Sequence, residues 1–169
     1  VADMMESGAT DNVTGLLVNP SFARSNDGWI KTGNGDFKND GTEITEVWNG
    51  RDWEVYQDVA GLPEGFYKIT VQGFYSPSSP TTSVWHAAWG TEGDEVNKVM
   101  ASVFGNDASA PIHHIADFPY DSKPEIGGWE QVSGTADGNL NGKWLPTDKA
   151  SSQEVFKSDS GNYLNTVSC

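Results

Sequence analysis

The chain has 169 residues, a formal net charge of −14 from 24 acidic and 10 basic residues, and seven Trp. This length fits one domain with a sizeable core, and an aromatic content of 11% excludes a disordered chain. The acidic balance argues against nucleic acid and against an anionic membrane surface, so we expect neither nucleic-acid binding nor membrane insertion. The single cysteine, Cys169, permits no internal disulfide.

Short apolar segments alternate with turn residues along most of the chain. Residues 1–14 are small, polar and acidic, and we interpret them as a leader or linker to one domain that spans 15–169. The predicted strands lie, in chain order, at 16–18, after the turn at 27–30, at 43–48, on both sides of the turn at 61–65, at 97–104, at 111–115 and at 163–167.

The run from Trp53 to Tyr75 carries the strongest pattern. Two alternating segments flank the breaker cluster 61–65. In the second segment one face carries Tyr67, Ile69, Val71 and Tyr75, and the other carries Phe66, Lys68, Thr70 and Gln72. A period of two indicates a strand with one face in a core. The pattern therefore predicts an all-β fold, an antiparallel sandwich.

One helix is predicted, at 147–157, where Thr147 or Asp148 can accept hydrogen bonds from the free amides of the first turn. The side chains expected to face the sandwich are Ala150, Val155 and Phe156. Residues 117–146 show no regular period, and long inserts of this kind are usually functional or mobile.

Four motifs occur in an order found in one family of β-sandwich modules. They are Asn19-Pro20-Ser21-Phe22 with Gly28-Trp29, the run 55–67, Met100 to Asn106, and Phe156 to Asn165 with Gly161 and Tyr163. In these motifs the chain resembles galactose-binding-like domains, which are common in secreted or surface proteins of polysaccharide-degrading bacteria. The resemblance implies an antiparallel jelly-roll β-sandwich of about eight strands, sugar binding, and a secreted or cell-surface location in a bacterium.

The chain departs from that family in two places. Ala23 stands where the family commonly has an acidic residue, sometimes part of a structural calcium site, so we expect no certain cofactor and calcium only as a weak alternative. The family also has further strands beyond the position of Cys169. We therefore expect a domain that is incomplete at its C-terminus, with an open sheet edge that another protein chain can complete.

Sugar recognition requires an aromatic face for the C–H side of a pyranose and polar groups around its rim. The candidate ligand-binding residues lie in two loops and are Trp48, Asn49, Arg51, Trp53, Trp85 and Trp89. Each loop Trp alternatively caps one end of the sandwich. We predict a non-catalytic carbohydrate-binding module. The alternatives are a structural or interaction module, which spaces domains or pairs through the open edge, and a hydrolase domain.

Catalytic and metal-binding motifs do not stand out in the sequence. It contains no nucleophile elbow, no Walker loop and no His-Glu-x-x-His motif. His113 and His114 are adjacent, so on a strand they point to opposite faces and do not readily bind one ion. Close acidic pairs arise by chance among 24 acidic residues. We therefore predict no catalytic residue and name no metal ligand.

Overall fold

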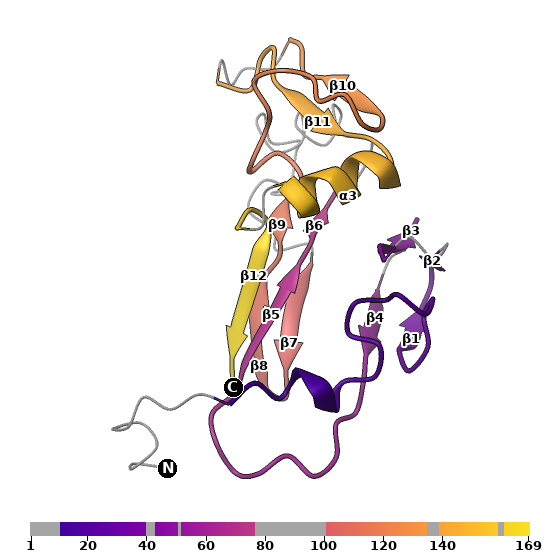
Figure 1. The fold of residues 1–169 in the computed structure, drawn as a ribbon, viewed down its shortest axis with the longest axis vertical. Helices are drawn as coiled ribbons and strands as arrows, with labels where there is room; N and C mark the ends of the chain where they lie inside the picture. The colour runs from indigo at the N-terminus through magenta and orange to yellow at the C-terminus, as the bar shows by residue number, and fades with distance from the viewer. Residues whose placement is uncertain (1–10, 40–42, 51, 77–100, 135–138, 159–160) are drawn as a thin grey trace. The chain divides into compact units, whose positions relative to one another are not determined.

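The computed structural model describes residues 11–39, 43–50, 52–76, 101–134, 139–158 and 161–169 (Figure 1). They belong to two compact units, Val1–Gly65 and Phe66–Cys169. The described residues form strands with a single short α-helix, which confirms the predicted all-β class. The jelly-roll connectivity and the domain boundaries at 1–14 and 15–169 stay predictions.

The first unit is built on one long, interrupted hairpin. Its strands are β1 (Ile30–Gly33), β2 (Asp36–Asn39), β3 (Thr45–Trp48) and β4 (Trp53–Tyr56). β1 pairs antiparallel with β4, and β2 pairs antiparallel with β3. Two residues separate β1 from β2 along the chain, whereas four separate β3 from β4. An unequal count of this kind interrupts the ladder and bends the strands, as a β-bulge does.

A short 3-10 helix, η1 (Thr14–Leu16), begins the first unit where a strand was predicted at 16–18. That prediction was wrong, because successive backbone amides donate to carbonyls three residues earlier at 2.9 and 3.0 Å. The Val18 amide then donates to Oε1 of Gln57 at 2.9 Å, and the Val18 carbonyl accepts from Nε2 of Gln57 at 2.6 Å. One glutamine side chain thus supplies the two hydrogen bonds that a neighbouring strand would make.

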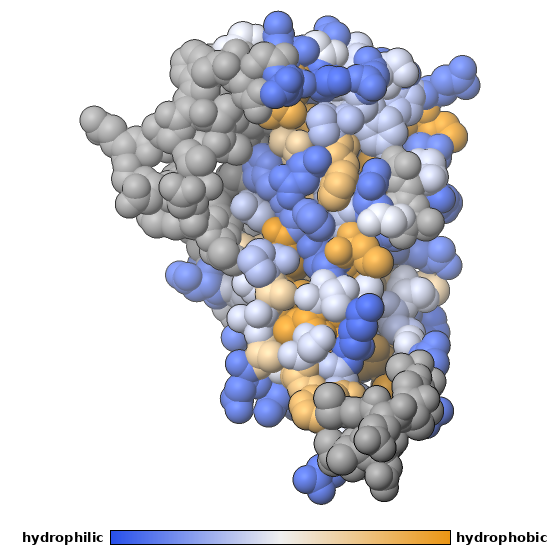
Figure 2. All heavy atoms as spheres, turned by 90° about the vertical axis from the view of Figure 1, so that its left-hand side faces the viewer, coloured by the Kyte–Doolittle hydropathy of each residue, from blue (hydrophilic) through white to orange (hydrophobic). Residues whose placement is uncertain are grey.

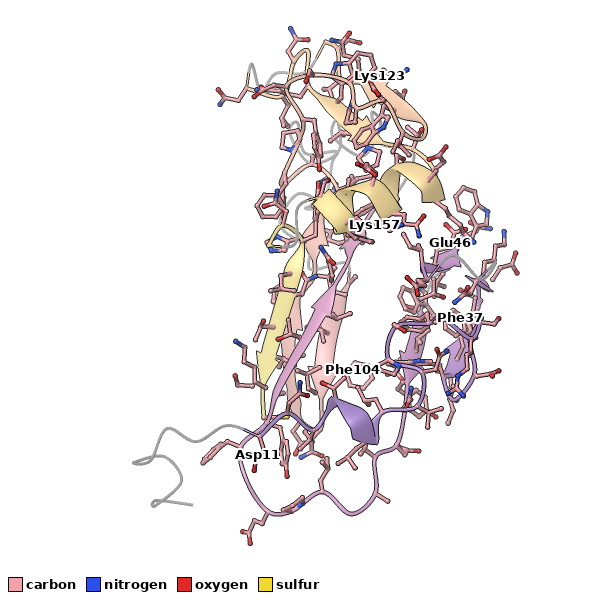
Figure 3. All side chains as sticks on the ribbon, in the orientation of Figure 1. Asp11, Phe37, Glu46, Phe104, Lys123 and Lys157 are labelled. Atoms are coloured by element: carbon pink, nitrogen blue, oxygen red, sulfur yellow. The ribbon has the colours of Figure 1, made fainter. Side chains whose placement is uncertain are left out.

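Aromatic rings join the loop at 19–29 to the inner face of the hairpin. Phe22 stacks on Trp29, with ring centroids 4.8 Å apart and planes 25° apart. The same Phe22 ring meets Phe37 of β2 edge-on at 6.4 Å. Figure 3 labels Phe37 and, on the neighbouring strand, Glu46. These rings hold the alternate residues of β2 inward, so the residues between them face outward.

The second unit contains most of the described strands. They are β5 (Lys68–Gln72), β6 (Phe74–Tyr75), β7 (Ser102–Gly105), β8 (Ala108–Pro111), β9 (His113–His114), β10 (Trp129–Gln131), β11 (Trp144–Pro146) and β12 (Leu164–Ser168). β5 pairs antiparallel with β12, β7 with β8, and β10 with β11, whereas β6 pairs parallel with β9. The β5–β12 pair packs against β7 and β8, as Figure 1 shows.

Burial along these strands follows the predicted period of two. The buried residues of β7 and β12 are Val103, Gly105, Asn165 and Val167. On β5 the exposed residues are Lys68 and Thr70, whereas Ile69, Val71 and Gln72 are half-buried. On the outer face, the Oγ1 atoms of Thr70 and Thr166 lie 3.3 Å apart. The alternation predicted for this segment is confirmed as far as Val71 and ends at Gln72.

The segment predicted as one strand up to Tyr75 is divided at Gly73 into β5 and β6. The Gly73 amide donates to the Tyr163 carbonyl at 2.9 Å, which extends the β5–β12 register by one residue. The next two residues, Phe74 and Tyr75, pair with β9 instead. Phe74 packs on Tyr163, with ring centroids 5.0 Å apart. Tyr75 meets the ring of His114 edge-on at 5.3 Å. The predicted single strand is therefore two strands with different partners.

The side chain of Asn165, only 3% exposed, joins three strands at this break. Its Oδ1 accepts from the His113 amide at 2.7 Å. Its Nδ2 donates to the carbonyls of Gly73 at 2.8 Å and of Tyr163 at 2.9 Å. These bonds satisfy backbone groups at the point where the antiparallel β5–β12 pair gives way to the parallel β6–β9 pair.

The helix α3 (Lys149–Ser158) confirms the helix predicted at 147–157. Asp148 caps it: Oδ1 accepts from the Ser151 amide at 2.8 Å, and the Asp148 amide donates back to Oγ of Ser151 at 3.1 Å. The hydrogen bond from the Ser151 amide is the main cause that lowers the pKa of the Asp148 carboxyl. This reciprocal pair fixes the first turn.

The inward face of α3 differs from the prediction at one residue. Val155 is fully buried and Phe156 packs beside it in the same cluster. Ala150 is exposed, so its predicted inward orientation was wrong. Ser151 is fully buried instead, because its hydroxyl is satisfied by hydrogen bonds to the capping residue and needs no water.

Two three-residue strands, β10 and β11, lie in the segment 117–146, where no period was found. Three residues show too little alternation to reveal a strand in the sequence. Leu145 of β11 is fully buried and packs with Ala116 and Val132. Trp129 of β10 packs in a second cluster with the helix.

The outer surface mixes polar and apolar residues. On the face shown in Figure 2, apolar residues are interrupted by hydrophilic ones. Within the part of the chain that the structure describes, no helix has both the length and the apolar composition needed to span a membrane.

Replacing Asn165 is expected to destabilise the second unit strongly. Asn165→Ala leaves the His113 amide and the carbonyls around it without their buried partner, so the free energy of unfolding falls by about 3 kcal/mol. Thr166→Ala, on the exposed face of the same strand, is the control and should cost less than about 1 kcal/mol. Urea unfolding followed by circular dichroism measures both, and equal losses would contradict this role of Asn165.

Candidate functional site

The outer face of the β2–β3 ladder carries a single large aromatic residue among charged ones. Residues directly opposite each other in an antiparallel ladder lie on the same face. Asp36 is paired with Trp48, and Lys38 is paired with Glu46. We call these four residues the Trp48 face. Trp48 itself is 59% exposed, so its ring is open to solvent.

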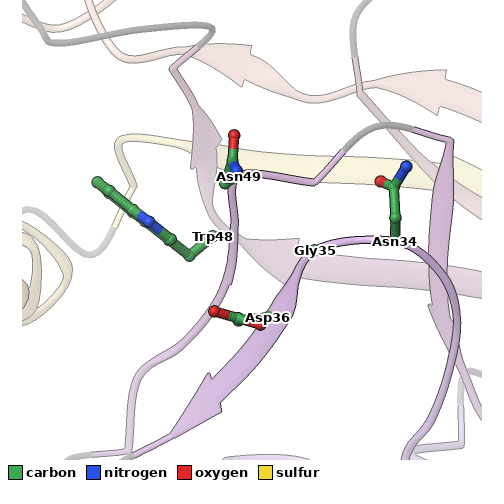
Figure 4. A pocket seen from close by; sticks show the side chains of 5 residues that line it. All are labelled: Asn34, Gly35, Asp36, Trp48 and Asn49. Atoms are coloured by element: carbon green, nitrogen blue, oxygen red, sulfur yellow. The ribbon is translucent and has the colours of Figure 1, made fainter.

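A hollow of about 490 Å³ lies beside Trp48, where the hairpin is interrupted (Figure 4). The described residues that line it are Asn34, Gly35, Asp36, Trp48 and Asn49. Figure 4 shows the side chains of Asp36 and Trp48 extending to the same side of the hairpin. The hollow therefore combines an indole, a carboxylate and two amides.

Glycine is required for the close approach of the two segments that form the hollow. Gly35 has a φ of 88°, and a Cβ atom there would fall on the Cα atom of Gly50. Across the ladder Asn49 has a φ of 51°, a left-handed conformation that asparagine tolerates better than most residues. The bend in the hairpin thus follows from residues suited to a positive φ.

Lys31 stabilises the bend in the hairpin of the first unit. Its Nζ donates to the carbonyls of Gly33 and Gly35, both at 2.7 Å. One ammonium group therefore binds two carbonyls at the point where the ladder is interrupted. This fixes the backbone on one side of the hollow.

A second lysine lies on the Trp48 face. Nζ of Lys38 is 5.4 Å from the ring centroid of Trp48 and 3.6 Å from Oδ2 of Asp36. The side chains of Lys38 and Asp36 are 44% and 72% exposed, so water screens the pair and its strength is small. The ammonium group is held loosely between the carboxylate and the indole.

Two of the six candidate residues from the sequence meet in this hollow. Trp48 and Asn49 line it, whereas Trp53, 36% exposed at the start of β4, does not. The other three candidates, Arg51, Trp85 and Trp89, lie outside the described residues. Asn34, Gly35 and Asp36 are residue types typical of a turn, and nothing local in the sequence shows that they lie across from Trp48.

The loop at 19–29, where the family resemblance raised a calcium site, is organised by side-chain amides. Nδ2 of Asn19 donates to the Ser25 carbonyl at 3.0 Å. Nδ2 of Asn39 donates to the carbonyls of Phe22 at 2.8 Å and of Ser25 at 2.9 Å. Amide donors thus occupy carbonyl oxygens of the kind that calcium prefers. Within the described ranges, no three His, Cys, Asp or Glu residues are grouped to hold a metal ion.

The two adjacent histidines have different hydrogen-bond partners. Nδ1 of His113 lies 2.9 Å from Oδ2 of Asp117. Nδ1 of His114 accepts from the Ala116 amide at 3.1 Å, which requires that this nitrogen carry no proton. Burial lowers the pKa of His114, and the charge of Asp117 opposes that shift. Burial also raises the pKa of the Tyr75 hydroxyl. We assign these groups to the structure of the β9 turn.

Comparison with known proteins leaves the family open: no protein-family model, no curated protein and no solved structure matches this chain. The resemblance to galactose-binding-like domains therefore stays a prediction from the four sequence motifs.

Acidification is expected to destabilise the chain through His114. Because its pKa is lowered on folding, the unfolded chain takes up a proton first, near pH 6.5, and stability falls as the pH decreases below that value. His114→Gln cannot titrate, so the variant should lose part of this pH dependence between pH 7 and 5. Urea unfolding at several pH values gives the two slopes. Identical slopes would show that His114 is not responsible.

Proposed function

We propose that the chain is a non-catalytic carbohydrate-binding module and that the Trp48 face binds glycan. The supporting observation is the position of Trp48, which is 59% exposed beside a hollow lined with amides and a carboxylate. A flat apolar ring next to convergent polar groups is the combination that a sugar requires, since its C–H face is apolar and its hydroxyls need partners.

Each lining group has a separate task in this proposal. The indole of Trp48 contacts the C–H face of a pyranose ring. The amides of Asn34 and Asn49 donate to and accept from sugar hydroxyls, and the carboxylate of Asp36 accepts from them. The Lys31 hydrogen bonds and the glycine bend hold these groups in place before the ligand arrives, which lowers the entropy lost on binding.

The expected affinity is modest. One stacked ring and a few hydrogen bonds at an open surface supply about 4–8 kcal/mol, which corresponds to dissociation constants from millimolar to micromolar. Such a module holds a larger protein near its glycan.

The proposal includes no catalytic step. Glycoside hydrolysis generally uses two carboxyl groups that flank the scissile bond. Among the described residues that line the hollow, Asp36 is the one that carries a carboxyl group. We therefore assign Asp36 to binding.

The fold family and the location belong to the same proposal. The four sequence motifs support a galactose-binding-like jelly roll in a secreted or surface protein of a polysaccharide-degrading bacterium. A glycan outside the cell is the ligand that such a protein would meet.

Removing the exposed indole is expected to remove glycan binding. Trp48→Ala should weaken binding at least about tenfold, because the apolar contact is lost while the backbone of the hollow remains. Biolayer interferometry with immobilised galactomannan, xyloglucan, hydroxyethyl cellulose, polygalacturonate and chitosan measures the effect, and tryptophan fluorescence gives a second readout.

Phe66→Ala is the matched control, since Phe66 is 73% exposed and belongs to the second unit. This variant should bind as the wild type does, and circular dichroism should show that both variants are folded. Wild-type protein that is retained on none of the glycans, or retained equally after Trp48→Ala, would refute the proposal.

A further inference from the structure

We propose that the Asp36–Lys38 pair sets the charge class of the glycan, so that the Trp48 face accepts uncharged sugars and discriminates against both uronates and amino sugars. This inference rests on the proposed function and adds a substrate class to it. It follows from where the two charges lie relative to the exposed indole.

Asp36 accounts for the discrimination against acidic sugars. It is the charged side chain among the described residues that line the hollow, and it lies directly across the ladder from Trp48. A sugar stacked on the indole therefore brings its substituents toward this carboxylate. A hydroxyl group donates a hydrogen bond to it, whereas a uronate carboxylate meets a like charge in a protein whose formal net charge is already −14.

Lys38 accounts for the discrimination against amino sugars. A ligand ammonium group would be attracted to the indole and to the carboxylate of Asp36 together. The Lys38 ammonium already lies there, 5.4 Å from the ring centroid of Trp48 and 3.6 Å from Oδ2 of Asp36. A cationic ligand must displace Lys38 or share the space with a like charge.

An uncharged sugar meets neither obstacle. It leaves the opposite charges of Asp36 and Lys38 paired and uses the indole for apolar contact. The pair is exposed and its interaction is weak, so it changes the relative affinities of charged and uncharged glycans but does not prevent charged glycans from binding. We expect each charge to change the affinity of the disfavoured class by about two- to fivefold, the range of an exposed cation–π contact.

The test compares wild type with Lys38→Gln and Asp36→Asn on the five immobilised polysaccharides named above, at about 0.15 M and 0.5 M NaCl to separate site effects from long-range charge. Wild type should bind at least one of the three uncharged polymers more tightly than polygalacturonate or chitosan. Lys38→Gln should strengthen chitosan binding by about two- to fivefold. Asp36→Asn should strengthen polygalacturonate binding by a similar factor.

Two control variants change the net charge equally without touching the hollow. Lys123, labelled in Figure 3, belongs to the second unit, and its Nζ lies 5.6 Å from the ring centroid of Trp144. Lys123→Gln therefore removes a matching lysine–tryptophan contact elsewhere. Asp121→Asn removes a carboxylate that pairs with Lys143 in the same unit. Neither control should alter the ranking of the polymers.

The outcomes separate this inference from the proposed function. If no polymer retains the wild type, glycan binding and its charge class fail together. If binding depends on Trp48 but the ranking is unchanged in Lys38→Gln and Asp36→Asn, or changes equally in the controls, only the charge-class inference is overturned. A wild type that prefers polygalacturonate or chitosan overturns it in the same way.

Discussion

Short strands leave many backbone groups without a ladder partner, and side-chain amides satisfy them throughout the described structure. Asn165 does this at the change from antiparallel to parallel pairing, and Gln57 does it for Val18. Asn19 and Asn39 bind the carbonyls of the loop that packs on the hairpin. Buried or partly buried backbone groups must be paired, so these amides stabilise the chain at points where strand pairing stops or changes.

The position of the Trp48 face also depends on a side chain that binds backbone groups where strand pairing is interrupted. At the interruption of the hairpin ladder, Lys31 binds the carbonyls of Gly33 and Gly35. With the backbone held there, the residues before and after the interruption form the walls of the hollow. The inner face of the hairpin is occupied by aromatic packing around Phe37, so the outer face presents Trp48 with its charged neighbours. The proposed glycan-binding surface and the packed interior therefore lie on opposite faces of one ladder.

Features with a local cause were predictable from the sequence, and those with a distant cause were not. The alternation up to Val71 and the capping of α3 by Asp148 depend on neighbours within a few residues. The division at Gly73 depends on β9, which pairs with β6 from far along the chain, and Val18 makes its hydrogen bonds with Gln57, 39 residues later. Trp48 and Asn49 were recognisable as a site by their chemistry, whereas the contribution of Asp36 required the register of the hairpin.

The two asparagines of the hollow share a chemical liability. Asn34 and Asn49 are each followed by glycine, which the close backbone approach demands at Gly35 and which offers no side chain to shield the neighbouring amide. Asparagine is among the thermolabile residues of proteins. Hydrolysis of either side-chain amide would add a carboxylate to the hollow beside Asp36, so the negative charge of the hollow would increase as the protein ages.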